Sequence, residues 1–291
     1  MTMLQDAPVQ VQQTAAKSAS ALRSILVHVE GSPEAAGRLN VAADLARMFD
    51  AKLMGVGVEM IQTLSDPYGM LGGEWVVQLQ TMVEDDLKRA EAAFRAKTAG
   101  LKTDWTSLET FPAPAMARHA RSADLIVAGG APIGREGSFR AADPAELVML
   151  SGRPVLIAPP KPGKFHGRAI VVAWKDTRES RRALADSLPF LLAAEEVAVV
   201  ECCDKDAVSD ARVNTADVVR HLRRHGVEAF GKAVATSPER VSTELNIAAQ
   251  DIGADLIVAG GYGHTRLGEW AFGGVTYDLL NAPERFVLLS H

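Results

Sequence analysis

A glycine-rich segment, GGYGHTRLGEWAFGG at 260–274, follows the apolar run ADLIVA and precedes a stretch with helical periodicity. Glycine suits a backbone that turns with positive φ, or one that another group approaches closely. If the next helix begins near Gly273 and Gly274, its first amides offer hydrogen bonds and a partial positive charge. His264 and Arg266 would add charge inside the loop. The residues alone leave two interpretations open, a phosphate cradle and a glycine-rich connection without a ligand.

The chain contains one pattern twice. The octapeptide ADLIVAGG occurs at 123–130 and again, identically, at 254–261. A similar opening segment precedes each octapeptide, ILVHVEGSPEAAGRLN from Ile25 and IVVAWKDTRESRRALA from Ile170. Repetition over this length predicts duplicated domains rather than a solenoid of short units.

The repeats define an expected domain organisation. We expect a polar, flexible tail over 1–22, a first copy over 23–159 and a second copy over 160–291. A linker rich in Pro, Gly and Lys falls around 159–167. The first copy is longer than the second, and its extra residues fit a loop over 61–75.

Short apolar runs alternate with helical stretches within each copy. In the second copy we expect strands at 169–174, 196–201, 227–233, 254–260 and 286–290, with helices near 178–191, 210–225, 238–251 and 270–281. Strands that are apolar on both faces and separated by helices predict a parallel sheet covered on both sides. The predicted fold class is α/β, two tandem Rossmann-like, doubly wound domains, each a five-stranded parallel sheet flanked by helices. Ligands of such sheets bind at the carboxyl ends of the strands, where the winding reverses.

The loop and the repeat together resemble the universal stress proteins, a family of Rossmann-like domains, here in tandem. Nucleotide-binding members carry G-x2-G-x9-G-[S/T] after the fourth strand. Gly260, Gly263 and Gly273 match that spacing, and Gly274 stands where the family has Ser or Thr. The resemblance covers about residues 23–291 and implies that the last strands of the two copies, PVLIA and FVLLS, pair within the chain.

The departures from the family pattern differ between the copies. Family members begin with a strand ending in an Asp that lies by the nucleoside of ATP, and the second copy has Lys175 there. Lys175 would reach phosphates, or would form a salt bridge with Asp176, Glu179 or a neighbouring acid. In the first copy, Pro132 and Ala142 replace the second and third glycines, so that loop does not build the same cradle.

The resemblance implies a stress-response protein that binds an adenine nucleotide, ATP with Mg, in the second copy. The residues expected at this nucleotide are Gly260, Gly261, Gly263, His264, Arg266, Gly273, Gly274, Val275, Trp174, Lys175 and Asp176. The alternative is a nucleotide-independent interaction protein that acts through protein partners. A slow nucleotide hydrolase ranks last, because no catalytic residues or metal ligands converge on the loop.

Other candidate residues have simpler interpretations. His221 and His225 share a helix face, but with arginines around them a solvated basic surface is favoured over a metal site. Cys202 and Cys203 are expected to be small hydrophobic residues at a strand end rather than redox thiols. Trp174 would stack on a base or pack at a domain contact, and we favour packing.

Composition narrows the class of protein further. A net charge of −5 argues against nucleic acid as a partner. No apolar run is long enough to span a membrane, and the N-terminal segment lacks a signal-peptide core. With only two adjacent cysteines, we expect a cytoplasmic protein. The pairing of the two copies within the chain would imitate a dimer of single-domain relatives, and the remaining exposed surface would allow a homodimer.

Overall fold

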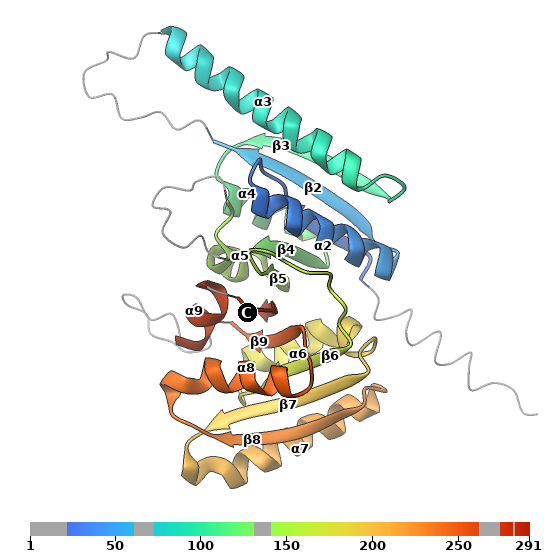
Figure 1. The fold of residues 1–291 in the computed structure, drawn as a ribbon, viewed down its shortest axis with the longest axis vertical. Helices are drawn as coiled ribbons and strands as arrows, with labels where there is room; N and C mark the ends of the chain where they lie inside the picture. Colours follow the sequence, from blue (N-terminus) through green and yellow to red (C-terminus); the bar gives the residue numbers. More distant parts are fainter. Residues whose placement is uncertain (1–21, 61–72, 131–140, 262–273, 282) are drawn as a thin grey trace, which may run out of the picture.

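The structure, a computed structural model, describes residues 22–60, 73–130, 141–261, 274–281 and 283–291. Within these ranges, none of the helices has both the length and the hydropathy of a membrane span. The described strands form a single 10-stranded sheet in the order β3-β2-β1-β4-β5-β10-β9-β6-β7-β8. Figure 1 shows the two copies above and below the pair β5 and β10 at the centre. The first copy supplies β1 to β5 and the second β6 to β10.

Strands and helices alternate along both copies, as the apolar periodicity predicts. The strands are β1 (Ser24–His28), β2 (Lys52–Glu59), β3 (Thr103–Glu109), β4 (Leu125–Gly129), β5 (Val155–Ala158), β6 (Ala169–Ala173), β7 (Glu196–Cys203), β8 (Ala229–Ala235), β9 (Leu256–Gly260) and β10 (Phe286–Ser290). The helices are α2 (Pro33–Phe49), α3 (Gly73–Lys97), α4 (Pro112–His119), α5 (Pro144–Ser151), α6 (Arg178–Leu191), α7 (Val208–Arg224), α8 (Val241–Asp251) and α9 (Gly274–Asn281), with 3-10 turns η1 (Ala120–Ser122), η2 (Lys205–Ala207) and η3 (Pro238–Arg240).

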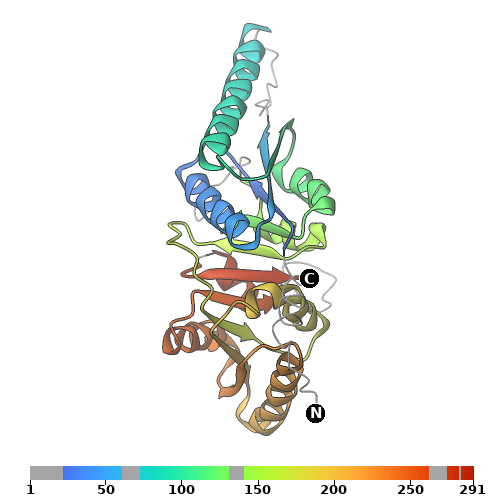
Figure 2. The ribbon, with the colours of Figure 1, turned by 90° about the vertical axis from the view of Figure 1, so that its right-hand side faces the viewer.

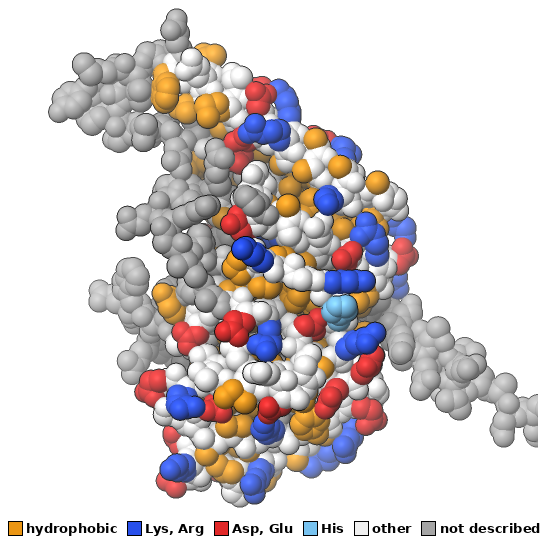
Figure 3. All heavy atoms as spheres, in the orientation of Figure 1, with side chains coloured by type: hydrophobic (Ala, Val, Ile, Leu, Met, Phe, Trp, Pro, Cys, Tyr) orange, Lys and Arg blue, Asp and Glu red, His pale blue; other side chains and the backbone are white. Residues whose placement is uncertain are grey.

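The strands within each copy run parallel, which confirms the predicted doubly wound α/β fold. Helices cover both faces of the sheet (Figure 2). On the face of the molecule drawn in Figure 3, basic and acidic side chains are interspersed. Apolar residues of α2, α3, α6 and α7 fill the core on one face. Those of α4, α5, α8 and α9 fill it on the other. Burial on both faces explains why the strands read as continuous apolar runs.

The two copies join through their last strands. β5 and β10 pair antiparallel, with Leu288 opposite Leu156, and both side chains are fully buried. The predicted pairing of PVLIA with FVLLS is therefore confirmed. Each strand would otherwise leave an open sheet edge, and the pairing removes both.

The linker between the copies is anchored in the core. Phe165 is 3% exposed, and its ring centroid lies 5.7 Å from that of Phe190 and 5.2 Å from that of Phe286. The Asp255 carboxylate accepts hydrogen bonds from the next two backbone amides, those of His166 at 2.7 Å and Gly167 at 3.1 Å. The linker is therefore a fixed part of the fold rather than a loose tether.

Two sequence-based boundaries need correction. Leu22 was assigned to the tail, but it is 5% exposed and belongs to the core. Residues 73–75 were assigned to a loop over 61–75, but they form the start of α3. The segments 1–21 and 61–72 lie outside the described residues.

Candidate functional site

The winding of the second copy reverses between β6 and β9, which are neighbours in the sheet. Trp174, Lys175 and Asp176 follow the carboxyl end of β6, and Gly260 and Gly261 lie at the carboxyl end of β9. Because Ala173 pairs with Ala259, the two segments leave the sheet side by side. The fold thus brings together sequence-predicted residues that are more than eighty positions apart, at the point where doubly wound sheets bind ligands.

Lys175 is exposed and forms no ion pair among the described residues. Asp176 pairs with Arg181 and Glu179 pairs with Arg178, so neither of these two acids forms the salt bridge with Lys175 that the sequence leaves open. The acid that the Lys175 charge does influence is Glu201, where it acts against the rise of the carboxyl pKa. Its ammonium group lies at the carboxyl edge of the sheet with its charge uncompensated by those neighbours.

Trp174 packs inside the core instead of offering a face to solvent. It is 8% exposed, and within the described residues its indole N–H has no acceptor. The neighbouring strand places Glu201 beside it, since Ala173 pairs with Val200. One oxygen of Glu201 accepts a hydrogen bond from Asn214 at 3.4 Å, and burial raises the pKa of this carboxyl, with the Asp176 charge adding to the shift. These observations favour the packing role for Trp174.

The first two glycines of the loop meet protein neighbours. A Cβ at Gly260 would lie 2.6 Å from the backbone nitrogen of Ser180, because the first turn of α6 passes directly over it. The amide of Gly261 donates to the carbonyl of Ser290 at 2.8 Å, so it is not free to bind a phosphate. A Cβ at Gly261 would also lie 3.0 Å from Cγ1 of Val148 in the first copy. Both glycines thus permit close packing.

Of the remaining loop residues, the structure describes only those from the start of α9 onward. Gly263, His264, Arg266 and Gly273 lie outside the described residues. Gly274 is exposed at the first position of α9, and a Cβ there would meet no atom within 4 Å. Val275 follows it, half-buried against the core.

In the first copy, the corresponding position between β1 and β4 is filled by a buried charge cluster of His28, Glu30 and Arg38. Arg38 reaches from α2, pairs with the Glu30 carboxylate, and donates from Nε to the His28 carbonyl at 3.2 Å. His28 Nδ1 lies 3.1 Å from the same carboxylate. A Cβ at Gly129 would lie 2.8 Å from the guanidinium of Arg38. The arginine therefore covers the end of β4, where the second copy has Gly260.

The pKa values in this cluster shift for opposing reasons. Burial alone would raise the pKa of the Glu30 carboxyl, but Arg38 and His28 together hold it below its usual value. Burial lowers the pKa of His28, which outweighs the attraction of Glu30. Glu30 and Arg38 thus form an ion pair next to a neutral imidazole.

The start of α5 is also closed in the first copy. The Asp143 carboxylate accepts hydrogen bonds from the amides of Ala145 at 2.7 Å and Glu146 at 3.3 Å. By the spacing of the octapeptides, the counterpart of Asp143 is Gly274, which has no side chain to make such a cap. An anion at this helix start would compete with Asp143 in the first copy but with no equivalent carboxylate in the second.

The sequence analysis missed the roles of Arg38 and Asp143. The signal lay in the repeat itself: aligning the two openings places Ala183 opposite Arg38 and Ala173 opposite His28. A charged residue in one copy facing alanine in the other marks a position where the copies differ in chemistry.

Of the other candidates, none gains a ligand set in the described part of the chain. The rings of His221 and His225 lie 4.8 Å apart, and no third His, Cys, Asp or Glu among the described residues joins them. Cys202 and Cys203 are free, and burial raises the pKa of the Cys202 thiol to about 11. A thiol with a raised pKa is a poor nucleophile at neutral pH.

The arrangement defines a class, an α/β protein made of two doubly wound copies that share one sheet. Structural comparison places this class among solved proteins. A universal stress protein from Archaeoglobus fulgidus DSM 4304 aligns with a TM-score of 0.63 and 15% identity, over 92% of this chain and 97% of that one. A putative universal stress protein from Pseudomonas aeruginosa UCBPP-PA14 aligns with a TM-score of 0.56 and 17% identity, over 93% and 94%.

The chain therefore has the universal stress protein fold in its tandem form, which confirms the resemblance found in the sequence. No protein-family profile and no curated protein sequence matches it.

Proposed function

We propose that this chain is a universal-stress-type protein whose second copy binds an adenine nucleotide, with the phosphates at Lys175 and the start of α9. The observation that carries the proposal is Lys175 at the reversal of the winding, which forms no ion pair among the described residues and lies beside two acids that both have arginine partners. A phosphate would complete the charge pairing that the protein leaves open there.

The contrast between the copies supports the same site. In the first copy, protein side chains occupy the corresponding site. Arg38 covers the end of β4, and the Asp143 carboxylate caps the start of α5. In the second copy, Ala183 and Gly274 stand at those positions. We infer that the two copies have different roles, the first structural and the second ligand-binding.

The expected fit is best at the phosphates. Lys175 and the amides that begin α9 are suited to an anion, and Mg would accompany ATP as its usual counter-ion. The buried Trp174 leaves no exposed ring on which the base would stack, and the Gly261 amide is engaged. A contribution of these two residues to nucleotide binding would therefore be indirect, by holding the shape of the site.

The melting temperature of nucleotide-free protein with and without Mg-ATP tests the proposal. At 100 times its dissociation constant, a ligand stabilises the folded state by about 2.7 kcal/mol. Gly274→Asp puts a carboxylate on the first residue of α9 and should weaken phosphate binding, as should Lys175→Ala. Lys52→Ala, which removes an exposed lysine paired with Asp104, is the matched control and should bind normally.

A second candidate function is a nucleotide-independent interaction protein. The close packing of the first turn of α6 on Gly260 favours it, since this contact narrows the strand end that a nucleotide would approach. An unchanged melting temperature at millimolar Mg-ATP would reject the nucleotide proposal in favour of this one.

A further inference from the structure

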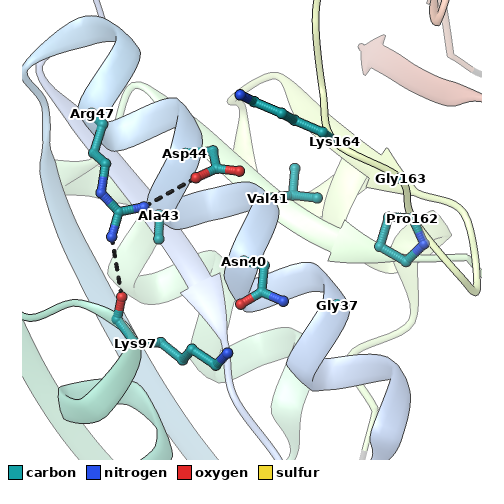
Figure 4. Close-up of a pocket in the computed structure, with 10 residues that line it drawn as sticks. All are labelled: Gly37, Asn40, Val41, Ala43, Asp44, Arg47, Lys97, Pro162, Gly163 and Lys164. Atoms are coloured by element: carbon teal, nitrogen blue, oxygen red, sulfur yellow. Dashed lines mark hydrogen bonds and ion pairs between the residues drawn. The ribbon is translucent and has the colours of Figure 1, made fainter.

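A second hollow lies away from the reversal of the winding, between α2, the end of α3 and the linker. Its volume is about 400 Å³, within the range of small-molecule sites. Figure 4 shows the lining residues, which come from three separate parts of the chain. They are Gly37, Asn40, Val41, Ala43, Asp44, Arg47, Lys97, Pro162, Gly163 and Lys164.

The wall of this hollow is held in place by tight packing. A Cβ at Gly37 would lie 2.8 Å from Cδ of Pro162, so the linker rests on the backbone of α2. Phe165, three residues further on, is fixed in the core by aromatic contacts. The linker side of the hollow is therefore held against α2 and the core on both sides of Gly163 and Lys164.

The charges around the hollow are unbalanced. Three cationic side chains, Arg47, Lys97 and Lys164, line it, against the single carboxylate of Asp44. That carboxylate is taken by Arg47, which donates to it at 3.0 Å and to the Lys97 carbonyl at 3.3 Å. Neither lysine ammonium has a carboxylate partner in the part of the chain that the structure describes.

The two lysines approach the hollow from opposite sides. In Figure 4, Lys97 extends from the end of α3 and Lys164 from the linker, with Asn40 and Asp44 of α2 between them. The Asn40 amide adds a hydrogen-bond donor. Of the lining residues on α2, only Arg47 lies in the last turn, and the others lie ahead of it, where the negative end of the helix dipole has little effect.

We propose that this hollow is an anion site for a small phosphorylated metabolite, with Lys97 and Lys164 as the phosphate-binding groups. The two ammonium groups lie on opposite sides of the α2 residues in Figure 4, so each would hold one of two separate anionic groups of the ligand, and the apolar Val41, Ala43 and Pro162 provide surface for a small organic body. A ligand here would connect the linker to α2, and so would stabilise the way the linker leaves the first copy.

Titration with inorganic pyrophosphate, followed by calorimetry at low ionic strength, tests this site. The double variant Lys97→Gln with Lys164→Gln should lower the affinity at least about tenfold, since it removes both charge-assisted contacts. The matched control is Lys88→Gln with Lys102→Gln, which removes the same charge from exposed lysines that already have acidic partners. It should bind like wild type.

Hydrogen exchange provides an independent readout, because pyrophosphate should slow exchange at the amides of Gly163 and Lys164. Lys175→Ala should leave this binding intact, which separates the site from the proposed nucleotide site. Absence of pyrophosphate binding at millimolar concentration would overturn the proposal. Equal loss of affinity in the control variant would also overturn it, since binding would then follow overall charge.

Discussion

Arg38 is the residue whose replacement should reveal most about the first copy. Arg38 and Glu30 are 5% and 7% exposed, and His28 beside them is 2% exposed. Arg38→Met keeps the aliphatic volume of the side chain but leaves the Glu30 carboxylate buried without its cation. Breaking a buried pair by removing one partner destabilises a protein by about 3–5 kcal/mol.

The control for this variant lies on the same helix. Arg47 pairs with Asp44 at 3.0 Å, but both side chains are at least 41% exposed. Arg47→Met should therefore change the free energy of unfolding by no more than about 1 kcal/mol. Both variants remove one positive charge from α2 and one hydrogen bond to a backbone carbonyl, so the burial of the ion pair is the main difference between them.

Urea denaturation followed by circular dichroism measures the effect on each variant, and thermal melting gives a second estimate. At about 2–4 °C per kcal/mol, the Arg38→Met melting temperature should fall by about 6–20 °C. Adding Glu30→Gln should recover part of the loss, because the unpaired carboxylate is then removed. The reasoning fails if Arg38→Met is no less stable than Arg47→Met, or if Glu30→Gln brings no recovery.

Three further predictions concern packing and pH. Gly260→Ala should destabilise by about 1–3 kcal/mol in denaturant titrations, because a Cβ would overlap the backbone of α6, whereas Gly31→Ala, with open space around it, should not. Phe165→Ala should destabilise by about 3–5 kcal/mol, since it removes the aromatic anchor of the linker, and calorimetric melting would show it. Because burial lowers the pKa of His28, the unfolded chain binds the proton first and stability should fall as pH drops below about 6.5. Melting curves between pH 7.5 and 5 should show a smaller acid loss in His28→Gln than in His221→Gln, whose histidine is exposed.

The two copies illustrate how one fold can diverge in its chemistry. Both start their first helix with a hydroxyl cap, Ser32 accepting from Ala35 at 3.1 Å and Thr177 accepting from Ser180 at 3.3 Å. The two copies differ in what lies at the end of the fourth strand, β4 or β9. In the first copy the guanidinium of Arg38 covers this strand end, and we propose that a ligand binds near it in the second copy.

The repeat, the order of strands and helices and the doubly wound fold can all be predicted from the amino-acid sequence. These features follow from local apolar periodicity and from the identical octapeptides, which need no knowledge of distant contacts. Through the family resemblance, the sequence predicts that the last strands pair. The sequence also predicts that Lys175 and the loop glycines lie at the same edge of the sheet, because the carboxyl ends of parallel strands share that edge.

The contacts that each of these residues makes depend on the tertiary structure. Gly260 and Gly261 have the same identity and nearly the same sequence position, yet one lies under α6 and the other on β10 and the first copy. The partners of Asp176, and hence the freedom of Lys175, depend on how α6 begins after β6. Such contacts join residues through helix placement over the sheet, which periodicity does not encode. For the same reason, the hollow beside Lys164 exists only because the linker folds back onto α2.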